Sequence, residues 1–176
     1  LEDYKFSSRL QIVDETYTMS FFFHTKKENL QELDKSGKNV NSVVLSNLNF
    51  RKAFSYAINR AEYVTATEGY KPAFSLMNSL YYYDFYNNPN SSYRNTDQAK
   101  QVLCDFYGVD TSKFANLDDA VASITGYDPE QAKVLFTEAF AEGIAAGYIT
   151  DNDGDGKSDQ TVRIEYCSSA TSDFMK

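Results

Sequence analysis

The sequence contains no tryptophan, one histidine and two cysteines, and the scarcity of histidine and cysteine argues against several classes of chemistry. Because His24 is the single histidine, no paired-histidine metal motif can form, and a Ser-His-Asp triad would have to be built around it. No nucleophile-elbow motif is present to supply the serine. The cysteine spacing excludes a zinc knuckle, so Cys104 and Cys167 are expected to be separate buried thiols or, in an oxidising compartment, a disulfide. We therefore expect that this chain is not an enzyme.

Positive charge is also scarce. Lysine and arginine total 17 against 25 acidic residues, which gives a formal net charge of −8. A chain of this sign repels phosphate backbones and anionic lipid headgroups, so we expect no nucleic-acid partner and no polybasic membrane contact. No apolar run is long enough to span a bilayer, and no signal peptide opens the sequence. The abrupt ends at Leu1 and Lys176 lead us to expect a piece excised from a longer chain.

Tyrosine and phenylalanine are abundant, with 14 and 13 residues respectively. Tyrosine combines a broad apolar ring with a polar hydroxyl, which suits recognition surfaces. The run YYYDFY at residues 81–86 lies in a segment, residues 70–94, that the sequence predicts to be irregular. So long an irregular segment in a compact domain is usually functional. We therefore take Tyr81, Tyr82 and Tyr83 as candidate ligand contacts, with a place in the hydrophobic core as the alternative.

Apolar periodicity predicts strands near both ends of the chain and helices between them. The expected strands are residues 9–13, 17–25 and 161–166, and the second half of 17–25 is apolar on both faces, as in a buried central strand. The expected helices are residues 48–64, 95–108, 118–124 and 128–147, with a short helix around Leu30 and Leu33. In the 95–108 helix, we expect Val102, Leu103 and Phe106 to face inward. This order indicates an α/β fold of mixed α+β character.

An acidic, glycine-containing run, DNDGDGKSD at residues 151–159, precedes the last predicted strand. Acids at its first, third and fifth positions, followed by glycine, match the start of an EF-hand-type calcium loop. The candidate ligands are the side chains of Asp151, Asp153, Asp155 and Asp159 and the carbonyl oxygen of Lys157. Because Val162 occupies the position where such loops carry a further acid, we expect an affinity on the order of 10⁻⁴ to 10⁻³ M. The prediction is a structural Ca²⁺, and the alternative is a solvated turn without metal.

Four stretches of the chain together resemble one protein family. The run NFRKAFSYAINR at residues 49–60 resembles the signature helix of the oligopeptide-binding (solute-binding family 5) receptors of ABC importers, which carry a VRKALSYAIDR-like run. The remaining three stretches are similar to that family in order and spacing: FFFHT at 21–25, GYKPA at 69–73 and YDPEQAKVLF at 127–136. The chain departs from the pattern at His24, where the family has Asn, and at Asn59, where it has Asp.

The resemblance implies that residues 1–176 form one lobe of a two-lobe, periplasmic-binding-protein type II-like fold, whose hinge closure buries the ligand. It implies a receptor that binds oligopeptides, or similar extended solutes, and delivers them to ABC permease subunits in the membrane. The second lobe of the same full-length chain would be a further partner. The implied location is extracytoplasmic, with the protein lipid-anchored at the outer face of a bacterial cell membrane. Nickel, a sugar or haem stay open as ligands.

His24 is a further candidate contact with the solute, and a structural role at the end of a strand is its alternative. A second hypothesis, a calcium-stabilised extracellular adhesion or interaction module, is motivated by the aspartate run and the tyrosine-rich surface. It requires no second lobe. The sequence that flanks this chain in its gene would separate the two hypotheses, because the receptor requires a second lobe and neighbouring permease genes.

Overall fold

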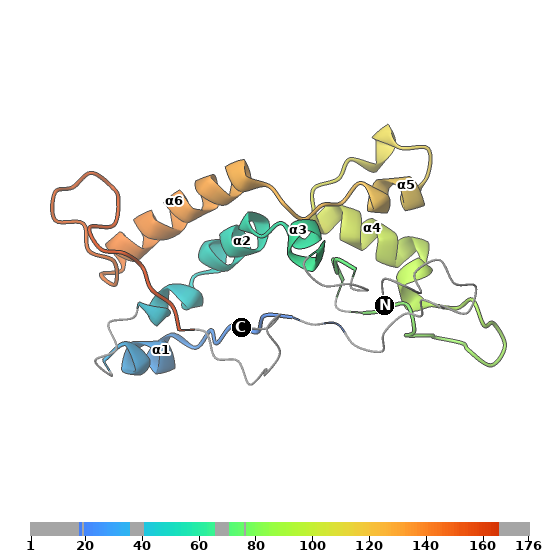
Figure 1. The fold of residues 1–176 in the computed structure, drawn as a ribbon, viewed down its shortest axis with the longest axis horizontal. Helices are drawn as coiled ribbons and strands as arrows, with labels where there is room; N and C mark the ends of the chain where they lie inside the picture. The colour runs from blue at the N-terminus through green and yellow to red at the C-terminus, as the bar shows by residue number, and fades with distance from the viewer. Residues whose placement is uncertain (1–17, 19, 36–40, 66–70, 76, 166–176) are drawn as a thin grey trace, which may run out of the picture. The chain divides into compact units, whose positions relative to one another are not determined.

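The computed structural model of the chain describes residues 18, 20–35, 41–65, 71–75 and 77–165 (Figure 1). In chain order, their helical elements are α1 (Lys27–Asp34), η2 (Ser42–Ser46), α2 (Leu48–Ala57), α3 (Arg60–Thr65), η3 (Tyr93–Asn95), α4 (Asp97–Phe106), η4 (Thr111–Lys113), α5 (Leu117–Ala122) and α6 (Pro129–Ala145). None of these helices has both the length and the apolar composition that crossing a bilayer requires. The first compact unit comprises the described residues of Leu1–Ser20 and Thr67–Thr125, and the second those of Phe21–Ala66 and Gly126–Lys176. Each unit has its own core.

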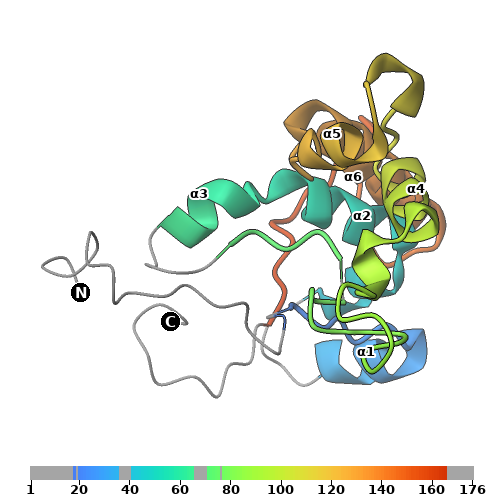
Figure 2. The same ribbon diagram turned by 90° about the vertical axis from the view of Figure 1, so that its right-hand side faces the viewer.

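The second unit is organised around α2 and α6, which lie side by side (Figure 1, Figure 2). The buried residues of its main apolar cluster are Leu30, Val43, Val44, Leu45, Phe50, Ala139 and Ile149. The ring of Phe50 on α2 meets the ring of Phe136 on α6 edge to face, with 5.3 Å between centroids. Such a ring pair adds to the stabilisation from burial of apolar surface. The core therefore joins helices that are far apart in the sequence.

Side-chain caps explain where α2, α4, α5 and α6 begin. The caps are Asn47 for α2, Thr96 for α4, Asn116 for α5 and Asp128 for α6, each accepting a bond from a backbone N–H three residues later. The sequence predicts the cap at Asp128, which is confirmed, and offers Asn47 or Asn49 as the cap of α2, of which the structure uses Asn47. Pro129 follows the Asp128 cap at the first helical position, where its missing N–H costs nothing.

The sequence predicts one helix over residues 48–64, and this prediction is wrong, because the structure has two helices there, α2 and α3. Ile58 is extended, with φ −91° and ψ 115°. The carbonyl of Tyr56, which a continuous helix would bond four residues on, accepts from the N–H of Asp128 at 3.0 Å. Asn59 then caps the start of α3, because its side chain accepts a hydrogen bond from the N–H of Glu62 at 3.2 Å. A tertiary hydrogen bond and a local cap therefore replace the continuous helix.

The strand predicted over residues 161–166 is not formed in its described part. Val162 and Ile164 pack against the core while their neighbours are exposed, so the predicted alternation is present. A strand also needs a ladder of backbone bonds to a neighbouring segment. Here the described residues provide one such bond, from the N–H of Asn41 to the carbonyl of Arg163 at 2.7 Å. The side-chain pattern is therefore that of a strand, and the backbone pairing is not.

The strand predicted over residues 17–25 is likewise absent from its described part, and the prediction that its second half is buried is wrong. Phe22 is 89% exposed. Phe23 packs against the core and meets the ring of Phe54 edge to face at 5.3 Å. Without a paired neighbour on either side, an apolar run has nothing to bury its second face. The described part of the chain is thus helical with one isolated β-bridge, and the α/β class is not confirmed.

The first unit has a smaller core, where α4 packs on α5. Its buried apolar residues are Cys104, Ala120 and Ile124. Leu103 packs against this core as predicted, but Val102 and Phe106 are 67% and 68% exposed, so the prediction is wrong for these two. Apolar residues form two adjacent stripes on α4, and the core covers the stripe that includes Leu103, Cys104 and Tyr107. Periodicity alone does not distinguish the two stripes.

Candidate functional site

The candidate tyrosines lie in the first unit, on a short antiparallel turn that we call the aromatic hairpin, residues 81–93. An isolated bridge pairs Tyr82 with Ser92. The backbone bonds beside it run from the N–H of Tyr83 to the carbonyl of Ser91 at 3.1 Å and from the N–H of Tyr93 to the carbonyl of Tyr81 at 2.7 Å. The structure therefore brings Tyr81, Tyr82 and Tyr83 together on one paired segment.

The rings of the aromatic hairpin lie on the surface of the unit. Tyr81, Tyr82 and Tyr83 are all exposed and belong to neither core cluster. The ring of Tyr82 contacts the ring of Phe85 at 5.2 Å, and Tyr86 is 96% exposed. Exposed aromatic rings grouped in this way are typical of surfaces that contact another molecule.

The aspartate loop, residues 151–159, lies in the second unit and gathers three of its predicted ligands. Carboxylate oxygens of Asp151, Asp153 and Asp159 all lie within 4.8 Å of one another. Gly156 has φ +80°, a conformation that glycine adopts without steric cost and that the sharp turn of such loops requires. Three close carboxylates repel one another, and a hard cation that accepts oxygen ligands would relieve the repulsion.

Asp155 and Lys157 are engaged with each other. The Asp155 carboxylate accepts from the ammonium of Lys157 at 2.9 Å and from its backbone N–H at 2.8 Å. These hydrogen bonds, first the side-chain bond and then the backbone bond, hold the pKa of Asp155 below its usual value. The same side-chain bond raises the pKa of Lys157. Asp155 is therefore not among the three gathered carboxylates, although its position in the sequence predicts it as a ligand.

The loop continues into the core rather than into a further acidic ligand. Val162 packs against the core of the second unit. Glu165, the next acid after the loop, is exposed. The gathered oxygens are therefore few for a Ca²⁺ ion, which takes six to eight oxygen ligands, and water would have to supply several.

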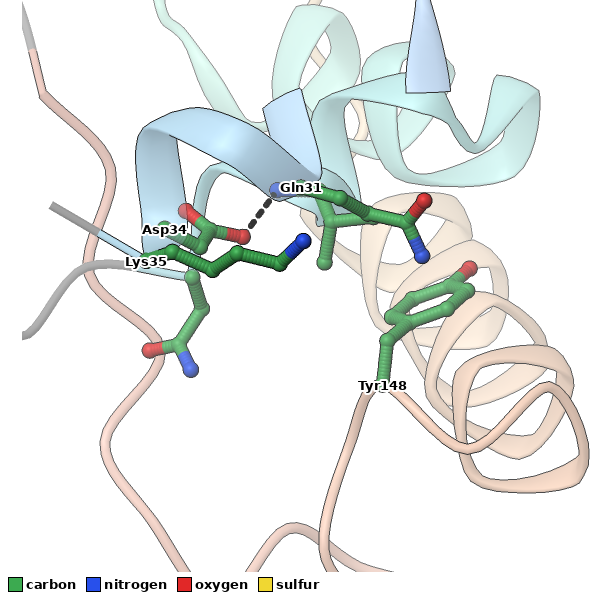
Figure 3. A pocket seen from close by; sticks show the side chains of 6 residues that line it. Gln31, Asp34, Lys35 and Tyr148 are labelled. Atoms are coloured by element: carbon green, nitrogen blue, oxygen red, sulfur yellow. Dashed lines mark hydrogen bonds between the residues drawn. The ribbon is translucent and has the colours of Figure 1, made fainter. Parts of the chain in front are cut away.

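An open groove of about 350 Å³ also lies in the second unit (Figure 3). Its lining residues are Gln31, Asp34, Lys35, Asn41, Val43 and Tyr148. Figure 3 shows Asp34 and Lys35 on the side opposite Tyr148, with the side chain of Gln31 extending toward the Tyr148 ring. The Asp34 carboxylate accepts from the N–H of Ser42 at 2.6 Å and of Val43 at 2.9 Å, so it holds η2 in place. Sequence reasoning missed this groove, because separate segments build it and no motif marks them.

The two arginines of the signature-like run bind backbone carbonyls. Arg51 donates to the carbonyl of Leu45 at 2.7 Å and of Asn47 at 3.2 Å. Arg60 donates to the carbonyl of Gly126 at 2.9 Å. An arginine that holds buried carbonyls in this way supports the fold. This run therefore builds the second unit.

The remaining candidates are single residues. His24 is exposed in the irregular segment before α1, and it has no hydrogen-bond partner among the described residues. Cys104 is a free, buried thiol whose pKa is raised by burial and, to a lesser extent, by the charge of Asp105. A buried thiol of this kind is unreactive. Cys167 lies outside the described residues.

Comparison with known proteins gives the class of the chain. Residues 8–173 match the sequence model of the bacterial extracellular solute-binding proteins, family 5 Middle. Proteins of this class bind solutes outside the cytoplasm and pass them to ABC permeases for import. The chain belongs to the bacterial extracellular solute-binding protein family 5. No curated protein and no solved structure matches it.

Proposed function

We propose that this chain captures oligopeptides, or similar extended solutes, for delivery to ABC permease subunits. The observation that supports a peptide as the solute is the aromatic hairpin, where Tyr81, Tyr82 and Tyr83 are all exposed. Their rings can stack on peptide side chains, and their hydroxyls can bond to the peptide backbone directly or through water. His24 is a further proposed contact. Capture makes and breaks no bond, so the proposed role is not enzymatic.

In this proposal, residues 1–176 form one lobe of a type II periplasmic-binding-protein fold, which the family implies. The second lobe of the same full-length chain would complete the binding site, and hinge closure would bury the peptide. We propose further that the protein is lipid-anchored at the outer face of a bacterial cell membrane, where it would meet its permease.

Calorimetric titration of the natural full-length protein tests the peptide proposal. A pool of random hexapeptides is expected to bind saturably, whereas nickel, maltose and haem are not. Replacing Tyr81 and Tyr83 together by serine is expected to weaken peptide binding by about tenfold or more, because stacked rings contribute roughly 0.5–1.5 kcal/mol each beyond their burial. Tyr63→Ser, which removes an exposed ring in the second unit, is the matched control. Tight binding of nickel, the sugar or haem without peptide binding would contradict the proposal.

We also propose a structural Ca²⁺ in the aspartate loop. Support comes from the sequence pattern of residues 151–159 and from the three gathered carboxylates of Asp151, Asp153 and Asp159. The same loop favours the second candidate function, a calcium-stabilised extracellular adhesion or interaction module. That module would act without a second lobe, and it would bind a protein or glycan in place of an imported solute.

Thermal unfolding with and without the metal tests the calcium proposal. Calcium at about 100 times its dissociation constant is expected to stabilise the fold by about 2.7 kcal/mol, and EDTA is expected to remove the gain. Replacing Asp151 and Asp153 together by Asn should abolish the response, whereas Glu138→Gln, an exposed acid on α6, should preserve it. A melting temperature that neither calcium nor EDTA changes would exclude the site.

A further inference from the structure

The aromatic hairpin has an open backbone edge at Tyr82. In an antiparallel pair, a residue whose neighbours make the cross-strand bonds points its own N–H and carbonyl away from the partner. Tyr82 is in this position, because Tyr81 and Tyr83 make the bonds on either side of it. Within the described part of the chain, neither the N–H nor the carbonyl of Tyr82 has a hydrogen-bond partner. With respect to the described residues, the edge therefore presents one free donor and one free acceptor.

The hairpin that carries this edge is held firmly from its inner side. Ser91 is 1% exposed, and its hydroxyl accepts from the N–H of Asp84 at 3.1 Å. Asn78, also buried, accepts from the N–H of Leu80 through its side chain at 2.8 Å. A segment ordered in advance loses little conformational entropy when a ligand binds. The edge at Tyr82 is thus prepared for binding before any partner arrives.

The stretch that carries the edge is aromatic and has almost no charge of its own, and Arg94 follows it directly. Within residues 77–93, the single charged side chain is Asp84, and it accepts from the side chain of Asn87 at 2.9 Å. No lysine or arginine lies in this stretch to attract an anion, and the whole chain has a net charge of −8. The net negative charge of the whole chain therefore disfavours acidic ligands, while apolar side chains gain contact with the exposed rings.

From this juxtaposition of a free backbone edge and uncharged, exposed rings, we propose that an extended peptide adds to the hairpin as a strand at Tyr82. Its backbone pairs with the N–H and carbonyl of Tyr82, and its alternate side chains pack on the rings of Tyr81 and Tyr83. The edge selects peptides with uncharged, apolar side chains over acidic ones. This inference rests on the proposed function and specifies the peptides that it captures.

A peptide fits this edge better than a lipid surface does. Contact with lipid would leave the backbone groups of Tyr82 unpaired in an apolar medium, at a cost of several kcal/mol per group. A peptide strand pairs both groups. A second copy of the chain would pair them as well, and it would then appear as a concentration-dependent dimer.

Three peptides test the proposal by calorimetry with the natural full-length protein. The first is a neutral hexapeptide of alternating leucine and asparagine. The second has aspartate in place of asparagine, and the third carries N-methyl groups on alternate amides, which removes the donors of one edge. We expect the neutral peptide to bind, and each of the other two to bind about tenfold or more weakly.

Two variants at one position isolate the backbone contribution. Tyr82→Ala keeps the free N–H and removes the ring, whereas Tyr82→Pro removes both, and proline is tolerated at an open edge whose N–H is unbonded. Tyr82→Pro is expected to weaken binding of the neutral peptide by about tenfold more than Tyr82→Ala does, because one hydrogen bond is lost. Thermal unfolding shows whether each variant is folded.

The outcomes separate this inference from the proposed function. Equal binding of the acidic and neutral peptides would overturn the inference while the proposed function stands, and so would equal binding of the N-methylated and neutral peptides. Two further results would overturn the inference in the same way. One is an equal loss of peptide affinity in Tyr82→Ala and Tyr82→Pro when both variants are folded. The other is a dimer of the unsubstituted protein that dissociates in Tyr82→Pro. If no peptide of any kind binds, the proposed function fails and the inference fails with it.

Discussion

Gly143 lies in the last turn of α6, where two effects oppose each other. A Cβ added there would lie 2.7 Å from Cδ1 of Ile149 and 2.9 Å from the ring of Tyr148. Gly143→Ala should gain about 1 kcal/mol from helix propensity and lose about 1–3 kcal/mol from overpacking. We expect the clash to dominate, because Ile149 is buried in the core and has little room to move. Chemical denaturation should therefore show a lower free energy of unfolding.

Ala141→Gly provides the control for this prediction. Ala141 is exposed on the same helix, so its replacement should cost about 1 kcal/mol through propensity alone. If Gly143→Ala instead raised the free energy of unfolding, propensity would be the larger effect. The expectation that the clash with Ile149 dominates at this glycine would then be wrong.

Asp110 provides a pH-dependent prediction at a single side chain. Its pKa is lowered, first by the hydroxyl of Ser112, which donates at 2.6 Å, and then by the N–H of Ser112 at 3.1 Å. A lowered pKa stabilises the fold above the pKa of the unfolded chain, and that stability is lost as the pH falls through the folded value. In an NMR titration, Ser112→Ala should raise the midpoint of Asp110 toward its ordinary value. An unchanged midpoint would rule out the hydroxyl as the main cause.

At the scale of elements, Glu142 links α6 to the start of α2. Its carboxylate accepts from the side chain of Asn47 at 2.5 Å and from that of Asn49 at 3.1 Å. Because Asn47 also caps α2, this acid fixes the cap against the neighbouring helix. Glu142→Ala is expected to lower the free energy of unfolding by about 0.5–1.5 kcal/mol. Glu138→Ala, on an exposed site of α6, should change it by less than about 0.5 kcal/mol, and equal losses would contradict the link.

The aspartate loop gives a prediction about metal affinity. The ammonium of Lys157 donates a hydrogen bond to the carboxylate of Asp155, which the sequence pattern predicts to be a Ca²⁺ ligand. Lys157→Gln removes this competing charge and leaves the carbonyl ligand in place. We therefore expect calcium to bind about threefold to tenfold more tightly in a calorimetric titration. Lys133→Gln, on α6, should leave the affinity unchanged. A weaker affinity in Lys157→Gln would exclude this role for the lysine.

At the scale of elements, features that depend on neighbouring residues were predictable from the sequence. Features that depend on contacts between distant segments were not. The cap at Asp128 was predictable, and that of α2 was narrowed to Asn47 or Asn49, because each cap depends on residues within one turn. The break between α2 and α3 was not, because it depends on a bond between the carbonyl of Tyr56 and the N–H of Asp128. The aspartate loop follows the same division, since its spacing predicted the gathered acids and missed the pairing of Asp155 with Lys157.

At the scale of the whole molecule, the family was predictable and the described architecture was less so. The run at residues 49–60 carried the resemblance, and the match over residues 8–173 confirms it. The strand predictions over residues 17–25 and 161–166 failed in their described parts, because periodicity reports which side chains face a core and says nothing of a pairing partner. The single-lobe assignment of residues 1–176 stays a prediction.

The central claim is that this protein captures peptides for import, and uptake by living cells tests it most directly. Cells that produce the natural full-length protein should accumulate a radiolabelled neutral hexapeptide of leucine and asparagine. Deleting its gene should abolish this uptake, and restoring the gene should recover it. Undiminished peptide uptake by the deletion strain, together with loss of uptake of a sugar, nickel or haem, would contradict the account.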